Sequence, residues 1–182
     1  GSTDKTAEKA AAIIPGVRII RHAKNHGKGA AVISGIARAT GDIVIIQDAD
    51  LEYSPSMYPS LLKPLIEENA DIVYGSRFLS SPHPAGMRMS YFLANRFANS
   101  LINMLCGISL TDCMTCFKVF KKHALQGIVL ESRGFGIEPE LTAKIVKKGL
   151  KIKEVPSSYN ARTFKEGKIL KMIYSLSVLW AI

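Results

Sequence analysis

Short apolar runs alternate with longer amphipathic segments along the first half of the chain. Residues 43–46 form an unbroken β-branched run, typical of a strand buried on both faces of a parallel sheet. The pattern predicts a helix before this run, from Ala30 to Ala39, and another after it with Pro55 in its first turn. A further strand is expected from Asp71 to Gly75. Because strands and helices alternate through short connections, we expect an α/β domain with right-handed crossovers.

Two more elements are expected near the amino terminus. Ser2 or Thr3 can cap a helix that runs to about Ile13, where Pro15-Gly16 would end it. Residues 17–21 then read as a short strand. The alternation of strands and helices therefore begins near the start of the chain.

The regular alternation of short strands and helices ends after residue 75. Residues 80–86 hold two prolines and a glycine and are expected to form a mobile loop. The long helix expected from Met89 to Cys106 has two different faces. One face carries Leu93, Phe97, Leu101 and Met104, and the other carries Asn95, Arg96, Asn99 and Asn103. The later elements are a strand over 117–120, a helix over 137–148, a strand over 152–155 and a helix from Glu166.

The last fourteen residues are the most apolar part of the chain. Residues 169–182 contain a single charge, Lys171, and no run reaches the length of a membrane span. As a helix this segment is amphipathic. Two interpretations stay open: a helix packed on the core, or a helix lying at a membrane interface.

Chain length and net charge limit the number of domains and the classes of binding partner. The chain has 182 residues, enough for one domain with a real core. Lys and Arg number 24 against 15 Asp and Glu, a net charge of +9 that favours an anionic partner such as a phosphorylated substrate or a phospholipid surface. The basic residues are spread out and no nucleic-acid-binding motif is present, which argues against nucleic acid.

The three cysteines are an odd number, and no signal peptide precedes them, so a reducing compartment is expected. Cys113 and Cys116 form a C-x-x-C with Cys106 and His123 nearby. A zinc or redox site would require these groups to converge, and three inert thiols are the alternative.

The candidate chemistry lies where the strand 43–46 ends. Asp48 and Asp50 follow it directly, with Glu52 as a third oxygen donor. Ligands of parallel sheets bind outside the carboxyl ends of the strands, and carboxylates suit Mg²⁺ or Mn²⁺. The alternative is that the two aspartates only cap the helix that starts near Pro55.

Seven short motifs in register resemble one family over essentially the whole chain. They resemble the family 2 inverting glycosyltransferases of GT-A fold, above all the polyprenyl-phosphate mannosyl- and glucosyltransferases. The fold implied is Rossmann-like α/β with a mostly parallel sheet. The motifs are residues 1–6, 25–31, 48–50, 75–77, 138–140, 158–162 and 166–168.

The resemblance implies roles on the donor side. Asp50 would hold Mg²⁺ or Mn²⁺ on the donor diphosphate, with Asp48 near the ribose and the metal. Glu52 stands where many relatives carry Gln. The other donor-binding residues implied are Lys28, which could instead be a solvated helix start, Ala49, Arg162 and Lys168.

The acceptor side is less specific. A phosphate acceptor is already an oxyanion near neutral pH and needs cations, for which Arg77, Arg88 and Arg96 are candidates. A hydroxyl acceptor would need a base, which Glu138 or Glu140 could supply. Both acids also suit the first turn of a helix for its dipole alone.

The resemblance implies a catalytic domain over residues 1–165 and an amphipathic helix over 166–182. The expected activity is metal-dependent hexose transfer from GDP-mannose or UDP-glucose to a polyprenyl phosphate at the cytoplasmic face of a membrane. A hydroxyl acceptor and a non-catalytic nucleotide-sugar-binding module are the alternatives. In the resembling family a strand and a helix precede the motif at residues 1–6, so we expect this chain to bind donor poorly and to associate with itself.

Overall fold

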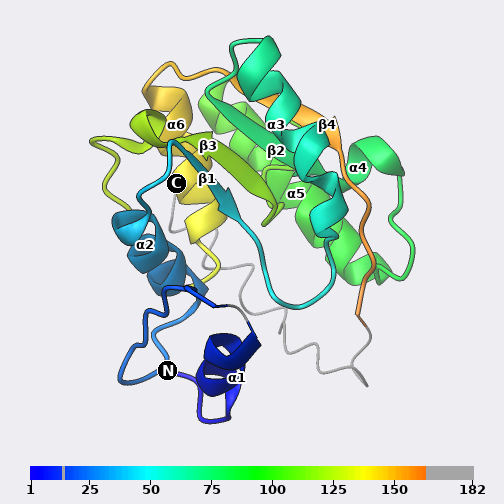
Figure 1. The fold of residues 1–182 in the computed structure, drawn as a ribbon. Helices are drawn as coiled ribbons and strands as arrows, with labels where there is room; N and C mark the ends of the chain where they lie inside the picture. Colours follow the sequence, from blue (N-terminus) through cyan, green and yellow to red (C-terminus); the bar gives the residue numbers. More distant parts are fainter. Residues whose placement is uncertain (14, 163–182) are drawn as a thin grey trace.

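The computed structural model describes residues 1–13 and 15–162, which build an open four-stranded sheet with helices on both faces (Figure 1). The strand order is β1-β3-β2-β4. Strand β3 runs antiparallel to β1 and β2, and β4 runs parallel to β2, so three of the four strands point the same way. The strands are β1 (Ile43–Ile46), β2 (Ile72–Ser76), β3 (Lys118–Lys121) and β4 (Ile152–Pro156).

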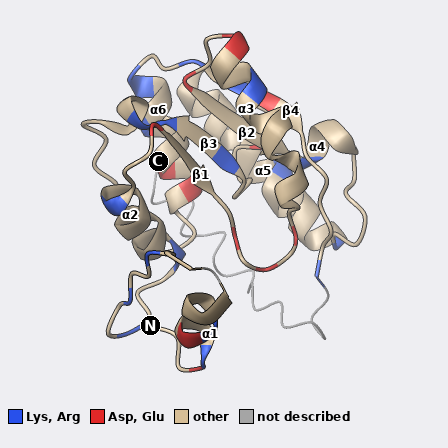
Figure 2. Ribbon diagram, viewed as in Figure 1, with Lys and Arg blue, Asp and Glu red and all other residues tan. Residues whose placement is uncertain are grey.

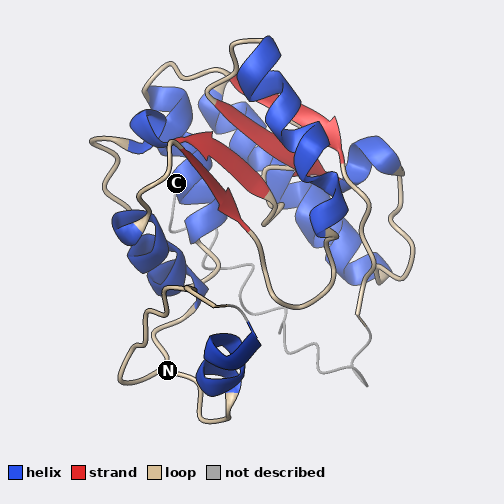
Figure 3. Ribbon diagram, in the orientation of Figure 1, coloured by secondary structure: helices blue, strands red, loops and turns tan. Residues whose placement is uncertain are grey.

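The helices form a layer on each side of this sheet (Figure 3). Helix α3 packs on one face, and α5 and α6 lie against each other on the opposite face. A short 3-10 turn, Pro55–Met57, leads into α3, and a second one, Lys122–Leu125, follows β3. The helices are α1 (Thr6–Ile13), α2 (Lys28–Arg38), α3 (Tyr58–Glu67), α4 (Arg77–Ser80), α5 (Met89–Cys106) and α6 (Ile137–Lys147).

Alternation along the strands divides the core in two. Ile72 and Tyr74 pack with α6, whereas Val73 between them packs with α3. Such period-2 alternation is what a sheet covered on both faces requires. Leu61 of α3 and Leu141 of α6 are each almost fully buried at the centres of the two clusters. The fold is therefore held by two apolar layers, one on each side of the sheet.

Most predicted elements are present. The bounds of α5 match the expected helix at both ends, and α2, α3, α6 and the four strands lie within a few residues of the expected ranges. Helix α1 begins at Thr6, later than a Ser2 or Thr3 cap predicts, because the Asp4 carboxylate accepts the backbone N–H of Thr6 at 3.1 Å. The expected helix from Glu166 and the residue Lys168 lie outside the described residues.

Two strand expectations were wrong. Residues 17–21 form no strand, and Val17, Ile19 and Ile20 are exposed in an extended segment. Strand β1 is not buried between parallel neighbours: it lies at the edge of the described sheet, pairs antiparallel with β3, and leaves Ile43 exposed. A β-branched run favours strand structure, but it does not specify which strands pair with it.

The sheet brings the sequence motifs to one edge. The carboxyl ends of β1, β2 and β4 point to the same side, and β3 begins there because it runs the opposite way. The segments that follow or precede these ends are residues 47–53, 77–80, 111–117 and 157–162. The start of α6 also carries candidate residues, which Lys28 of α2 links to the loop after β1.

Candidate functional site

An acidic loop leaves β1 at this edge (Figure 2). Within it the Asp50 carboxylate accepts the backbone N–H of Glu52 at 3.1 Å, which tightens the turn. Leu51 between them has a φ of +64° and an exposed side chain. A left-handed backbone is uncommon and costly for a non-glycine residue, and such strain gathers at functional loops. The loop therefore holds its acids in a specific backbone conformation.

Asp48 is bound to a buried lysine. Lys28 Nζ lies 2.7 Å from Asp48 Oδ2 and 3.2 Å from Glu138 Oε1, and the lysine and Glu138 side chains are only 15% and 6% exposed. Burial alone would lower the pKa of Lys28, but the surrounding acidic groups outweigh burial and raise that pKa. Lys28 thus stays charged and links the loop after β1 to the start of α6.

Glu138 has one oxygen engaged and one without a partner in the described structure. Its Oε1 contacts Lys28 and also accepts from the Cys116 thiol at 3.5 Å, whereas its buried Oε2 makes no hydrogen bond. An unsatisfied buried carboxylate oxygen is costly and calls for a bound group. Glu138 is therefore a functional candidate at this site.

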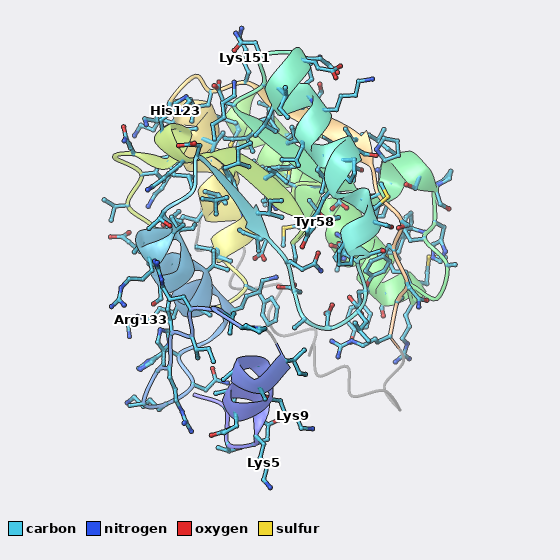
Figure 4. The ribbon with its side chains drawn as sticks, viewed as in Figure 1. Lys5, Lys9, Tyr58, His123, Arg133 and Lys151 are labelled. Atoms are coloured by element: carbon cyan, nitrogen blue, oxygen red, sulfur yellow. The ribbon has the colours of Figure 1, made fainter. Side chains whose placement is uncertain are left out.

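Two glycines position Lys28. Gly27 has a φ of +94°, and a Cβ on Gly29 would lie 2.0 Å from the backbone oxygen of Ser132. The loop that carries Arg133 lies beside α2 (Figure 4), and the Arg133 carbonyl accepts the backbone N–H of Ala30 at 3.0 Å. The Gly-Lys-Gly pattern is thus explained by a close backbone approach that directs the lysine toward Asp48.

A second cation pairs with the other aspartate. Arg162 Nη2 lies 3.2 Å from Asp50 Oδ2, and the Arg162 backbone N–H donates to Glu52 Oε1 at 3.1 Å. Tyr159 OH donates to Glu52 Oε2 at 3.0 Å. Glu52 therefore joins the segment after β4 to the loop after β1. Tyr159 lies within the motif at residues 158–162, but nothing in the sequence predicts its role.

The three arginines expected on the acceptor side differ in their surroundings. Arg77 is buried, and its Nε and Nη2 each lie 2.7 Å from an oxygen of Asp112. Its Nη2 also donates to Asn95 of α5 at 3.1 Å. Arg88 and Arg96, in contrast, are exposed, and Arg96 lies over the Phe78 ring. The structure therefore brings Arg77 to the sheet edge as a paired residue and leaves the other two on the surface of α5.

Glu140 lies apart from Glu138. Its carboxylate accepts the backbone N–H groups of Glu131 and Ser132, both at 2.8 Å, and pairs with Lys144 at 2.5 Å. Burial alone would raise the pKa of Glu140, but these hydrogen bonds together outweigh burial and lower that pKa. Residues two apart on a helix point in different directions, so only Glu138 of the acidic pair reaches Lys28.

The three cysteines are free thiols. Burial raises the pKa of both Cys113 and Cys116 to about 12. Within the part of the chain that the structure describes, no three His, Cys, Asp or Glu side chains gather as a ready-made metal site. The interpretation as inert thiols is therefore favoured over a zinc site.

The residues present nevertheless suit a divalent cation that arrives with an anionic ligand. Asp48 and Asp50 supply hard oxygen donors at a strand end, and each is balanced by one cation, Lys28 or Arg162. A metal bound partly by phosphate oxygens needs only one or two protein carboxylates. The donor set therefore fits Mg²⁺ or Mn²⁺ bound together with a diphosphate. Ala49, between the two aspartates, is exposed.

The sequence resembles known proteins. The profile described as glycosyl transferase family 2 matches residues 1–129. The chain is 30% identical over 176 residues to a dolichol-phosphate mannosyltransferase of Pyrococcus furiosus, covering 92% of this chain and 48% of that protein. It is 28% identical over 177 residues to an undecaprenyl-phosphate mannosyltransferase of Micrococcus luteus, covering 92% and 70% respectively. The chain thus spans about half the length of the Pyrococcus relative.

The fold also has solved counterparts. The crystal structure of glucosyl-3-phosphoglycerate synthase from Mycobacterium tuberculosis with UDP superposes with a TM-score of 0.70 at 23% identity, covering 100% of this chain and 64% of that one. The same enzyme with Mn²⁺ and UDP-glucose gives a TM-score of 0.66 at 23% identity, with 100% and 65% covered. At this identity the likeness concerns the fold, and it confirms the expected GT-A architecture.

Proposed function

The chain belongs to glycosyl transferase family 2, and from this we propose that it forms the donor-binding core of an enzyme that transfers a hexose from GDP-mannose or UDP-glucose to a polyprenyl phosphate. The observation that carries the proposal is the pairing of two strand-end aspartates with two cations, Lys28 and Arg162. The names of the two mannosyltransferase relatives support the lipid phosphate as acceptor.

We propose that these four charged residues form the donor site. Bound Mg²⁺ or Mn²⁺, held by Asp48 and Asp50, would supply Lewis-acid stabilisation of the leaving diphosphate. Arg162 would exchange Asp50 for the donor diphosphate, since a guanidinium binds phosphate oxygens as readily as carboxylates. Lys28 would stay between Asp48 and Glu138 and hold the two carboxylates at fixed positions.

On the acceptor side, a lipid phosphate needs no base because it is already ionised near neutral pH. Arg88 and Arg96 are the exposed cations near the site that would receive it. Arg77, bound to Asp112 and Asn95, would act mainly by holding α5 against the end of β2. A polyprenyl phosphate lies in a bilayer, so the reaction would take place at a membrane surface.

One observation favours a second candidate function. The unpartnered Oε2 of buried Glu138 could accept a proton from a sugar hydroxyl, which is the task of a general base. That acceptor chemistry would need Glu138 for turnover, whereas a phosphate acceptor would not. Turnover by a Glu138→Gln variant with polyprenyl phosphate therefore separates the two candidates.

The test of donor binding is Asp50→Ala. The side chain is half-buried in a loop and belongs to neither apolar cluster, so the fold should remain intact while metal-dependent donor binding is lost. Calorimetric titration with GDP-mannose or UDP-glucose plus Mn²⁺ measures this, and an unchanged affinity would refute the metal assignment. Metal-dependent binding without turnover on any acceptor would instead favour a non-catalytic nucleotide-sugar-binding module.

A further inference from the structure

The outer face of helix α5 is apolar and exposed. Met89, Leu93, Phe97 and Met104 are 58%, 58%, 67% and 72% exposed, although each is a large hydrophobic side chain. Their spacing places them along one side of the helix, and we call these four residues the α5 stripe. Scattered exposed hydrophobic residues are ordinary, but a continuous stripe of this kind marks an interaction surface.

Asparagines hold the helix in this orientation. Asn99 is buried, donates to the Leu110 carbonyl at 2.7 Å and accepts the backbone N–H of Cys113 at 2.8 Å. Asn103 donates to the same carbonyl at 2.8 Å, and Asn95 is bound by Arg77. The polar side of α5 is thus packed inward by hydrogen bonds. Turning the α5 stripe toward the core would break these bonds, so the stripe faces outward as a fixed feature.

The charges around the stripe indicate the kind of partner. No Asp or Glu occurs between Asp71 and Asp112, whereas Arg88 and Arg96 lie on this stretch and are exposed. Arg88 caps the start of α5, and Arg96 adjoins Phe97. Large apolar side chains flanked by arginines, with no acidic residue, match an anionic lipid surface, where the apolar groups enter the bilayer boundary and the arginines contact headgroups.

We propose that the α5 stripe, with Arg88 and Arg96 beside it, rests on the surface of an anionic bilayer. None of the helices in the described part of the chain has the length and hydropathy to cross a bilayer, so the contact is one that lies on the surface. This inference rests on the proposed function in one respect: Arg77 joins α5 to the sheet edge, so the bound face would bring the site to a lipid phosphate.

The test is co-sedimentation of the whole chain with vesicles that contain no polyprenyl phosphate. We expect binding to phosphatidylcholine vesicles that contain phosphatidylglycerol. Phe97→Asp should lose about tenfold or more of this binding, since a charge replaces a large apolar group that enters the bilayer boundary. The matched control is Ile66→Asp, because Ile66 is 71% exposed on α3 and should bind like the parent chain. Arg96→Gln should lose about fivefold on anionic vesicles, as expected for one cation at such a surface, and little on pure phosphatidylcholine.

Several outcomes would overturn the proposal. Equal binding by Phe97→Asp and Ile66→Asp would place the lipid contact elsewhere in the chain. Light scattering that shows a parent dimer separated by Phe97→Asp, without vesicle binding, would make the stripe an interface between copies. Thermal unfolding by circular dichroism confirms that each variant is folded. Donor titration with Mn²⁺ of the parent chain and of Asp50→Ala is the independent readout: equal affinities in the two, with vesicle binding intact, would refute the proposed function and leave this inference standing.

Discussion

At the scale of single residues, the site is a set of charges that are already neutralised. Asp48 pairs with Lys28, and Asp50 pairs with Arg162. The two aspartates therefore do not repel each other strongly in the ligand-free protein, and an incoming cation must compete with an existing partner. This competition makes Arg162 a residue whose removal should affect metal and nucleotide in opposite directions.

We expect Arg162→Ala to strengthen the binding of Mn²⁺ alone by a few-fold, because Asp50 loses a competing cation. We expect the same change to weaken nucleoside diphosphate binding in the presence of Mn²⁺ by about tenfold, the usual effect of losing one charged hydrogen bond that is partly exposed to solvent. Calorimetry with each ligand separately measures both effects. The control is Lys153→Ala, which removes a surface pair with Glu68. A parallel loss of both affinities would refute the exchange of partners.

The thiols give a second prediction at this scale. Because burial raises the pKa of Cys113 and Cys116 to about 12, their reactive thiolate is scarce at neutral pH and grows only as the pH rises toward that value. Cys106 and Cys116 are both half-buried, but burial raises the pKa of Cys106 by less, so we expect Cys106 to be alkylated first at pH 7. Mass spectrometry after timed treatment with iodoacetamide checks this order. Early labelling of Cys116 would show that its surroundings open in solution.

At the scale of elements, the start of α2 depends on a close backbone contact. We expect Gly29→Ala to lower the free energy of unfolding by about 1–3 kcal/mol, because its Cβ would overlap the Ser132 oxygen and a backbone must move. The control lies on the same helix: nothing lies within 4 Å of a Cβ at Gly35. Gly35→Ala should therefore stabilise the helix by about 0.5–1 kcal/mol. Urea unfolding of the two variants should give changes in the free energy of unfolding of opposite sign. Changes of the same sign would contradict the close contact at Gly29.

Elements are also where the sequence predicts best, and where its limits appear. The bounds of α5 follow from its 3.6-residue pattern, but that pattern does not say which side packs inward. The asparagine side does so here, because Leu110 and Cys113 in the irregular segment after the helix fold back and supply its hydrogen-bond partners. The position of β1 at an edge, and the absence of a strand over 17–21, likewise depend on pairing between segments and not on local composition.

For the candidate site too, the sequence predicts some residues and misses some of their contacts. Asp48, Asp50, Lys28 and Arg162 were found because they lie at strand ends or match family motifs, and the structure brings them together. The separation of Glu138 from Glu140 could have been expected from helix geometry. The link from Tyr159 to Glu52 could not, since it joins residues far apart in the chain through a hydrogen bond that no spacing encodes.

At the scale of the whole molecule, Arg77 ties several parts together. It joins the end of β2 to Asp112 and to Asn95 of α5. We expect Arg77→Ala to lower the free energy of unfolding by about 3–5 kcal/mol, because it leaves the Asp112 carboxylate buried and unpaired. Arg88→Ala, at an exposed position, is the control and should change stability little. Urea midpoints that are equal for both variants would show that Arg77 is free to bind a substrate instead.

The position of antiparallel strand β3 also sets the distance between two segments of the site. Because β3 lies between β1 and β2, the loop that carries Asp48 and the turn that carries Arg77 start two strand spacings apart, about 10 Å. The hydrogen-bonded ladders on both sides of β3 fix this separation of the two backbones, and only side chains can reach across it, as Tyr159 does from the segment after β4 to Glu52. A ligand that contacts the backbones of both the Asp48 loop and the Arg77 turn must therefore extend over the width of one strand. A group transferred between ligands bound at these two segments would lie over the start of β3.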